Sequence, residues 1–153
     1  IEYTINFYSN NNVSSVVSQT FKYDEKKALD ANSFTYTGYT FTGWNTAPNG
    51  GDTPYSDRAE ILNLADADGT VINLYAQWSL NSYEVKFVDH DGTVLKSDTI
   101  NHFDAATAPA NPSRTGYTFT GWYTDPGCFN PWDPAQDKIE GDMTLYAGWQ
   151  EKP

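Results

Sequence analysis

One seven-residue stretch, Gly-Tyr-Thr-Phe-Thr-Gly-Trp, occurs twice in this chain of 153 residues, at positions 38–44 and 116–122. The copies lie 78 positions apart (116 minus 38), and identity over seven residues indicates an internal duplication. Aromatic residues that alternate with threonine predict a β-strand, with Tyr39 and Phe41 on one face and Trp44 on the other. The glycines indicate a turn into this strand and a bend, or a close backbone approach, near its end.

Shorter matches surround the repeat and keep the same order in both halves of the chain. The strand-like run at residues 3–8 recurs at residues 83–88, and each half ends with a run that contains Leu-Tyr-Ala. We therefore expect two tandem modules, residues 1–79 and residues 80–153. Modules of this size are near the lower limit for a self-sufficient hydrophobic core.

Each module reads as two strands, a short helix or turn, a strand, a loop and a final strand. Residues 24–31 contain good helix formers after Asp24, an N-cap residue, which predicts a helix of about two turns with Ala28 and Leu29 facing inward. In the second module Pro109 and Pro112 prevent a long helix at the matching place. The pattern predicts a small, strand-rich α+β fold with one sheet per module.

Composition narrows the possible partners. The net charge of −11 and the pI near 4.3 argue against nucleic-acid binding, which needs a basic surface. No apolar run approaches the roughly 20 residues that span a bilayer, so we expect no membrane insertion. The single cysteine, Cys128, excludes an internal disulfide. The chain reads as a segment of a longer protein.

The residues that carry chemistry are few and scattered, which predicts a protein without enzymatic activity. His90 falls in a predicted turn and His102 at a strand end, and Cys128 has no adjacent base, so no catalytic set is recognisable. The Asp-Gly turns at 66–69 and 89–92 lack the further oxygen ligands of an EF-hand, and a turn is the better interpretation. We expect no catalytic residues, no cofactor and no metal.

The aromatic residues are the remaining candidates. Those that recur at matching strand positions are predicted to be structural core, namely Tyr39, Phe41, Trp44, Tyr75, Trp78, Tyr117, Phe119, Trp122, Tyr146 and Trp149. Aromatic residues near the loops, where the two copies stop agreeing, are the candidates for ligand contact. These are Tyr55, Tyr123, Phe129 and Trp132.

The aromatic blocks resemble a known family. The Gly-Tyr-Thr-Phe-Thr-Gly-Trp-Tyr run from residue 116, the Pro-Trp at 131–132 and the Leu-Tyr-Ala-Gly-Trp at 145–149 are similar to the Listeria/Bacteroides repeats, also known as the B-repeats of internalin B. The resemblance covers nearly the whole chain as two copies. It implies a ubiquitin-like β-grasp fold and a place in multidomain surface proteins of bacteria.

The function expected from this resemblance is that of a spacer. Such repeats stand in tandem between a functional head and the cell wall, so the partners would be neighbouring repeats or domains of the same protein, outside the cell. The alternative is an adhesion module that binds a host protein or a glycan through exposed loop aromatics. A calcium-dependent or enzymatic accessory domain is a third, weaker alternative.

Overall fold

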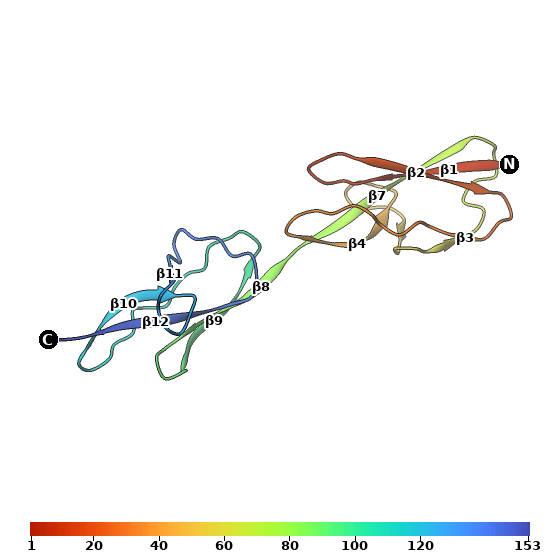
Figure 1. Ribbon diagram of the computed structural model, residues 1–153. Coiled ribbons are helices and arrows are strands. Elements are labelled where there is room, and N and C mark those ends of the chain that lie inside the picture. The colour runs from red at the N-terminus through yellow and green to blue at the C-terminus, as the bar shows by residue number, and fades with distance from the viewer. The chain divides into compact units, whose positions relative to one another are not determined.

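The computed structural model describes residues 1–153, which form two compact units, Ile1–Ser79 and Leu80–Pro153. Every regular element is a β-strand (Figure 1). The strands of the first unit are β1 (Glu2–Tyr8), β2 (Val16–Lys22), β3 (Lys27–Ala28), β4 (Tyr39–Asn45), β5 (Pro54–Tyr55), β6 (Glu60–Ile61) and β7 (Thr70–Leu80). Those of the second are β8 (Ser82–Val88), β9 (Val94–Asn101), β10 (Tyr117–Tyr123), β11 (Pro131–Trp132) and β12 (Met143–Glu151). No helix of the protein is long and apolar enough to cross a membrane.

Both units have the same five-stranded sheet. Its order is β2-β1-β7-β4-β5 in the first unit and β9-β8-β12-β10-β11 in the second. The opening hairpin is antiparallel, and its first strand pairs in parallel with the closing strand of the unit, as Ile5 does with Ile72. Because parallel neighbours need a crossing connection, the segment after the hairpin must pass over one face of the sheet.

The crossing segment contains no helix, so the predicted α+β fold, a β-grasp with one short helix or turn in each module, is wrong and both units are all-β. In the first unit Asp24 lies in a turn, and the short strand β3 that follows pairs with β6 as a separate two-stranded sheet. Asp24 does not cap a helix, since its φ is +67°, and its carboxylate accepts a hydrogen bond from the Asn63 side chain at 2.8 Å.

Tertiary contacts explain why the extended form replaces the helix. The buried side chain of Gln19 reaches from β2 to the crossing segment, where it donates to Ala28 O (3.1 Å) and accepts from Asp30 N (2.8 Å). Leu29 N donates to Ala59 O at 2.9 Å, and the Leu29 side chain is buried. A two-turn helix is marginal in water, so these contacts outweigh its local propensity.

The second unit holds its crossing segment through other residues. Phe103 N donates to Ile139 O at 2.6 Å, and Ile139 N donates to Asp104 O at 2.9 Å. Lys96, on the edge strand β9, donates from Nζ to Thr107 O at 2.7 Å. In both units, therefore, backbone hydrogen bonds join the crossing segment to the segment that precedes the closing strand, and a side chain from the edge strand bonds to its backbone, although the sequences differ.

Each unit has its own hydrophobic core between the sheet and the crossing segment. The first core consists of Tyr3, Ile5, Phe7, Phe21, Leu29, Trp44, Ile61, Leu74 and Ala76. The second consists of Val85, Phe87, Ala106, Trp122, Ile139, Leu145 and Ala147. Six positions of the second core match the first by their place in the repeat, namely Val85, Phe87, Trp122, Ile139, Leu145 and Ala147.

The repeated tryptophan faces the core together with its neighbouring phenylalanine. The expectation from strict alternation, that Phe41 and Trp44 lie on opposite faces, is wrong: their ring centroids are 5.0 Å apart. In the second unit the pairing of β10 with β12 shifts register between Phe119 and Gly121, which is a β-bulge. Gly121 has φ +128° there, a conformation that glycine adopts without strain, and the extra residue turns Trp122 inward.

Candidate functional site

The aromatic residues predicted as structural core fall into two groups that differ in burial. Trp44 and Trp122 are 2% and 5% exposed. The others are half-buried. Phe41, Trp78, Phe119 and Trp149 pack against the two cores. The tyrosines Tyr39, Tyr75, Tyr117 and Tyr146 belong to neither core cluster; Tyr39 stacks on Tyr36, Tyr75 stacks on Tyr8, and Tyr117 lies beneath Arg114.

The structure does not gather the four predicted ligand-contact residues into one surface. Tyr55 and Trp132 are half-buried against the cores, and each pairs across strands with the repeated tryptophan of its unit. Tyr123 is half-buried too, and its hydroxyl donates to Thr120 Oγ1 at 3.1 Å. Phe129 alone projects into solvent, with 83% of its surface exposed.

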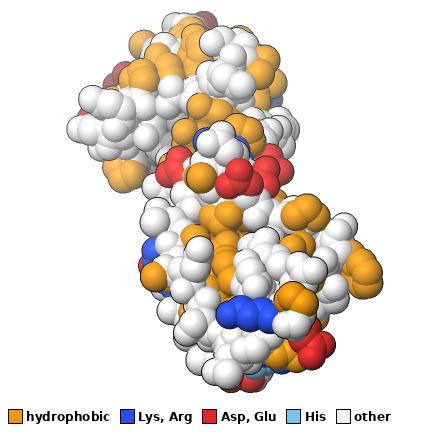
Figure 2. All heavy atoms as spheres, turned by 90° about the vertical axis from the view of Figure 1, so that its left-hand side faces the viewer, with side chains coloured by type: hydrophobic (Ala, Val, Ile, Leu, Met, Phe, Trp, Pro, Cys, Tyr) orange, Lys and Arg blue, Asp and Glu red, His pale blue; other side chains and the backbone are white.

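Charged side chains give no continuous basic surface on the face drawn in Figure 2. Lys and Arg side chains lie there in separate small groups, with acidic groups between them, and hydrophobic side chains reach the surface at several separate places. The nine Lys and Arg residues of the chain are outnumbered by 20 acids. A site must therefore be sought in local arrangements of side chains.

A surface pocket of about 370 Å³ in the second unit brings together ionisable side chains of several kinds. It lies where the turn between β8 and β9 meets the loop after β10, next to β12. Its lining includes Asp89, His90, Arg114, Cys128 and Trp149. The closing backbone bonds of the turn, from Asp89 N to Thr93 O (2.9 Å) and from Gly92 N to Asp89 O (3.0 Å), fix this geometry.

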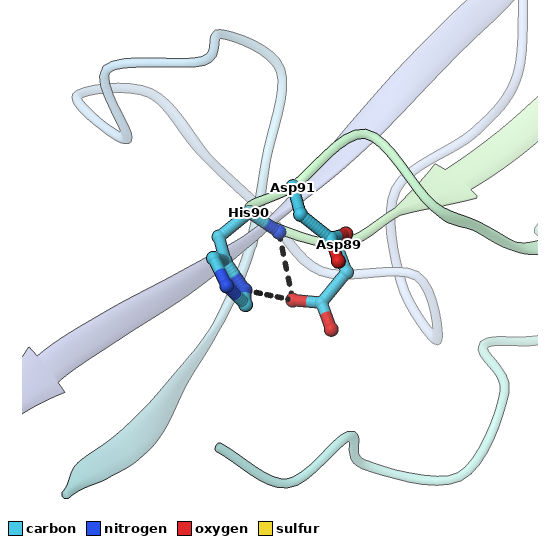
Figure 3. A group of neighbouring side chains, drawn as sticks. All are labelled: Asp89, His90 and Asp91. Carbon is cyan, nitrogen blue, oxygen red and sulfur yellow. Dashed lines mark hydrogen bonds and ion pairs between the residues drawn. The ribbon is translucent and has the colours of Figure 1, made fainter. Parts of the chain in front are cut away.

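Asp89 is the centre of the pocket's hydrogen bonds (Figure 3). Its Oδ1 accepts from His90 N at 2.7 Å, from His90 Nδ1 at 3.0 Å and from Trp149 Nε1 at 3.1 Å. Partial burial raises the pKa of Asp89, but these hydrogen bonds and the charge of His90 outweigh burial, so its pKa lies below the usual value. Asp89 is therefore an ionised acceptor at neutral pH.

Asp91 belongs to the same turn and is also held as a carboxylate. Its Oδ1 accepts from Thr93 N at 3.0 Å, and this backbone hydrogen bond lowers the pKa of Asp91. One donor atom from each of Asp89, His90 and Asp91 can be chosen so that all three lie within 4.8 Å of one another. The turn thus presents two oxygens and a nitrogen together.

Cys128 lies in the loop after β10 in a left-handed conformation, with φ +58°. Burial raises the pKa of the Cys128 thiol, and the negative charge of Asp125 raises it further. Its Sγ lies 3.8 Å from both Pro126 O and Ala147 O. A thiol whose pKa is raised is a poor nucleophile at neutral pH, because the thiolate is the reactive form.

The first unit has different chemistry at the same place. Ser9, Asn10 and Asn11 stand where the second unit has Asp89, His90 and Asp91, at a constant offset of 80. Asn10 Nδ2 donates to Pro48 O at 2.9 Å and to Ala76 O at 2.8 Å, so the amide ties the turn to the loop. Trp78 Nε1 donates to the backbone oxygen of Ser9 at 2.8 Å, whereas Trp149 Nε1 donates to the carboxylate of Asp89.

The loop itself is also built differently in the two units. Gly50, with φ +78°, occupies the position of Cys128. A Cβ on Gly50 would come within 2.7 Å of Gln77 Oε1, whereas the residue that matches Gln77 in the second unit is Gly148. The cysteine is therefore accommodated where a bulky neighbour is absent.

Each motif taken alone does not predict the pocket. Asp89, His90 and Asp91 have the pattern of a plain turn, and Cys128 lies 37 residues beyond Asp91 (128 minus 91). The available signal was the alignment of the two copies, because Ser9, Asn10, Asn11 and Gly50 are all replaced by ionisable residues. His102, the other histidine, lies elsewhere and its Nδ1 is 3.0 Å from the Tyr83 hydroxyl.

Two similar all-β units in tandem define this chain as a repeat segment. The chain belongs to the Listeria-Bacteroides repeat domain family, whose profile matches residues 3–77 and 83–148. The two matched segments correspond to the two copies, which confirms the resemblance to this family.

Relatives of the chain are much longer proteins. It is 40% identical over 111 residues to Internalin H of Listeria monocytogenes, a match that covers 72% of this chain and 19% of the relative. It is 32% identical over 135 residues to a protein of Evansella cellulosilytica named "Putative Gly-rich membrane protein", covering 88% of this chain and 15% of the relative. The matches thus span less than a fifth of either relative.

Proposed function

We propose that this chain is a spacer segment of a bacterial cell-surface protein and holds a functional domain away from the cell wall. The observation that carries the proposal is the tandem repetition of a unit with its own core, in a family whose relatives include an internalin and a protein named as a membrane protein. Repeats that contact only their neighbours along the chain suit this mechanical role. The partners are neighbouring repeats or domains of the same protein.

The connection between the units supports a spacer of limited flexibility. β7 ends at Leu80 and β8 begins at Ser82, so Asn81 is the single residue between the two strands. Asn81 O accepts a hydrogen bond from His102 N at 2.8 Å, which ties the connection to the second unit. A connection with few free torsions gives a tandem array less conformational freedom than a long polar linker does.

Small-angle scattering tests the spacer proposal. The test compares, in solution, the 153-residue chain with a chain that contains this sequence twice. The two copies are joined through a repeat of the Leu80-Asn81-Ser82 connection. A spacer requires the maximum dimension to grow in proportion to the number of units, to roughly twice the value. A duplicated chain that collapses to a compact particle, with little increase in this dimension, would contradict the proposal.

An adhesion module is the second candidate, and the exposure of Phe129 is the observation that favours it. A large aromatic ring with 83% of its surface in solvent is available for contact with a protein or a glycan. The test is binding of the chain to glycan and host-protein arrays, with Phe129→Ala compared against Val94→Ala, another exposed apolar residue. Reproducible binding that only Phe129→Ala removes supports adhesion, whereas an absence of binding leaves the spacer as the function.

A further inference from the structure

We propose that the turn Asp89–His90–Asp91 in the second unit binds one divalent transition-metal ion of the borderline class, such as Zn²⁺, Ni²⁺ or Cu²⁺. The turn brings two carboxylates and an imidazole together, with donor atoms within 4.8 Å of one another. Figure 3 shows the ring of His90 turned toward the carboxylate of Asp89. Imidazole and carboxylate are the ligands that this class of ion accepts.

The distance between Asp89 Oδ1 and His90 Nδ1 fits two ligands of one ion. They are 3.0 Å apart. Two ligand atoms at about 2.0–2.1 Å from an ion, at angles between square and tetrahedral, are separated by roughly 3 Å. Since Asp89 is an acceptor only, Nδ1 carries the proton in the hydrogen bond. The ion would replace that proton, and the neutral imidazole would keep its proton on Nε2.

Asp91 and the neighbouring pocket complete the surroundings of the ion. Oδ1 of Asp91 accepts from Thr93 N, and the carboxylate is exposed. His90 is partly exposed, so solvent can reach the ion and fill the remaining positions. Three protein ligands are too few for calcium, which takes six to eight oxygens, and the imidazole favours a transition metal.

Cys128 and Arg114 line the same pocket. Cys128 is not among the three residues whose donor atoms lie within 4.8 Å of one another, so its thiol is not counted as a ligand. The Arg114 guanidinium repels a cation, but it is held 3.7 Å from the centroid of the Tyr117 ring. The two carboxylates and the net charge of −11 outweigh this single cation.

The first unit supplies an internal control. Its matching turn has Ser9, Asn10 and Asn11, and the Asn10 amide is already engaged by two carbonyl oxygens. An amide offers no anionic ligand and no imidazole, so this turn should not bind the ion. Binding confined to the second unit would distinguish a site from diffuse attraction of cations to an acidic protein.

Nuclear magnetic resonance of the full chain during titration with Ni²⁺ or Cu²⁺ tests the proposal. A paramagnetic ion at the turn should broaden the amide signals of residues 89–93 and the indole N–H signal of Trp149, whose ring centroid lies 6.1 Å from that of His90. The signals of residues 9–13 and of the Trp78 indole should remain. Broadening of both indoles to the same extent, or broadening spread over all acidic loops, would overturn the proposal.

Calorimetry with Zn²⁺ gives the second measurement, with variants that copy the first unit. His90→Asn reproduces Asn10 and should weaken binding at least about tenfold, and Asp91→Asn should weaken it less. Asp104→Asn, which changes an exposed acid away from the turn, should leave binding unchanged. His90 is partly exposed, so its variant should keep the spectrum of the folded chain. Zinc binding that His90→Asn does not alter, or no binding to the unaltered chain, would refute the site.

Discussion

At the scale of single residues, Trp122 shows how much of each unit depends on one ring. Its centroid lies 4.9 Å from Phe87 and 5.3 Å from Phe119, both at edge-on angles, and it is 5% exposed. Aromatic pairs in this geometry add to the stabilisation from burial. Its counterpart Trp44 has the matching contacts with Phe7 and Phe41, at 4.9 and 5.0 Å.

We predict that Trp122→Ala unfolds the second unit and leaves the first unit folded. Removal of a buried aromatic ring lowers the free energy of unfolding by about 3–5 kcal/mol. A core this small supplies little more than that. In nuclear magnetic resonance spectra, the amide signals should lose their chemical-shift dispersion for residues 80–153 only. Phe129→Ala, at an exposed position, is the control and should change stability by less than about 0.5 kcal/mol; a folded second unit in Trp122→Ala would contradict the prediction.

We predict that Cys128→Gly stabilises the second unit by about 1 kcal/mol. The left-handed conformation is unfavourable for a residue with a Cβ and carries no such penalty for glycine, the residue found at the matching position 50. Denaturant unfolding should show a higher midpoint. Cys128→Ala keeps the Cβ and should show no gain, so equal gains in both variants would mean that loss of the thiol, not the backbone, is responsible.

At the scale of elements, the crossing segment shows tertiary contacts overriding local preference. Residues 24–31 contain helix-forming side chains, yet they form no helix because Gln19 supplies both a donor and an acceptor to their backbone. The Gln19 amide thus supplies the hydrogen bonds that a neighbouring strand would otherwise supply to this backbone. Its loss leaves two buried or half-buried backbone groups without a partner.

We predict that Gln19→Ala lowers the free energy of unfolding of the first unit by about 1–3 kcal/mol, the usual effect of unsatisfied buried polar groups. Hydrogen exchange should accelerate at Asp30, whose N–H now bonds to Gln19. The control is Ser18→Ala, the adjacent exposed residue on β2, whose hydroxyl bonds to Asn6. Unchanged exchange at Asp30 would show that other contacts hold the segment.

At the scale of the whole molecule, the two units share an architecture and differ in their dependence on charge. The three aspartates whose pKa values lie below the usual range, Asp89, Asp91 and Asp125, are all in the second unit. Asp125 owes its lowered pKa mainly to the backbone hydrogen bond from Phe129. The matching positions in the first unit are the uncharged Ser9, Asn11 and Ala47.

We predict that acid destabilises the second unit more than the first. A carboxyl with a lowered pKa in the folded state binds fewer protons when folded than when unfolded. Its stabilisation is present above the unfolded pKa of about 3.9 and is lost as the pH falls through the folded value. Unfolding followed through the Trp44 and Trp122 indole signals between pH 7 and pH 3 should show this difference.

The matched variant for this pH effect carries the residues of the first unit. Asp89→Ser, Asp91→Asn and Asp125→Ala together should make the pH dependence of the second unit resemble that of the first. A second unit that is no more acid-sensitive than the first in the unaltered chain would show that the lowered pKa values do not persist in solution.

The amino-acid sequence by itself determined the duplicated organisation of this protein, its longer strands and its family. These features depend on local, period-two patterns and on identical residues at a constant spacing, both visible without coordinates. The positions of Trp44 and Trp122 in buried strands were predictable in the same way. The face on which Trp122 lies was not, because the glycine bulge that turns it inward depends on the pairing of β10 with another strand, β12.

Only the tertiary structure decided the conformation of the crossing segments and the grouping of Asp89, His90 and Cys128. The helix expected at residues 24–31 does not form, because the Gln19 side chain satisfies the backbone groups of Ala28 and Asp30 in the extended form. These partners lie 9 and 11 residues from Gln19, and no local sequence pattern indicates the contact. The pocket forms because the sheet order brings a hairpin turn beside the loop after β10. Such contacts depend on how strands pair in space, which the periodicity of a single strand does not encode.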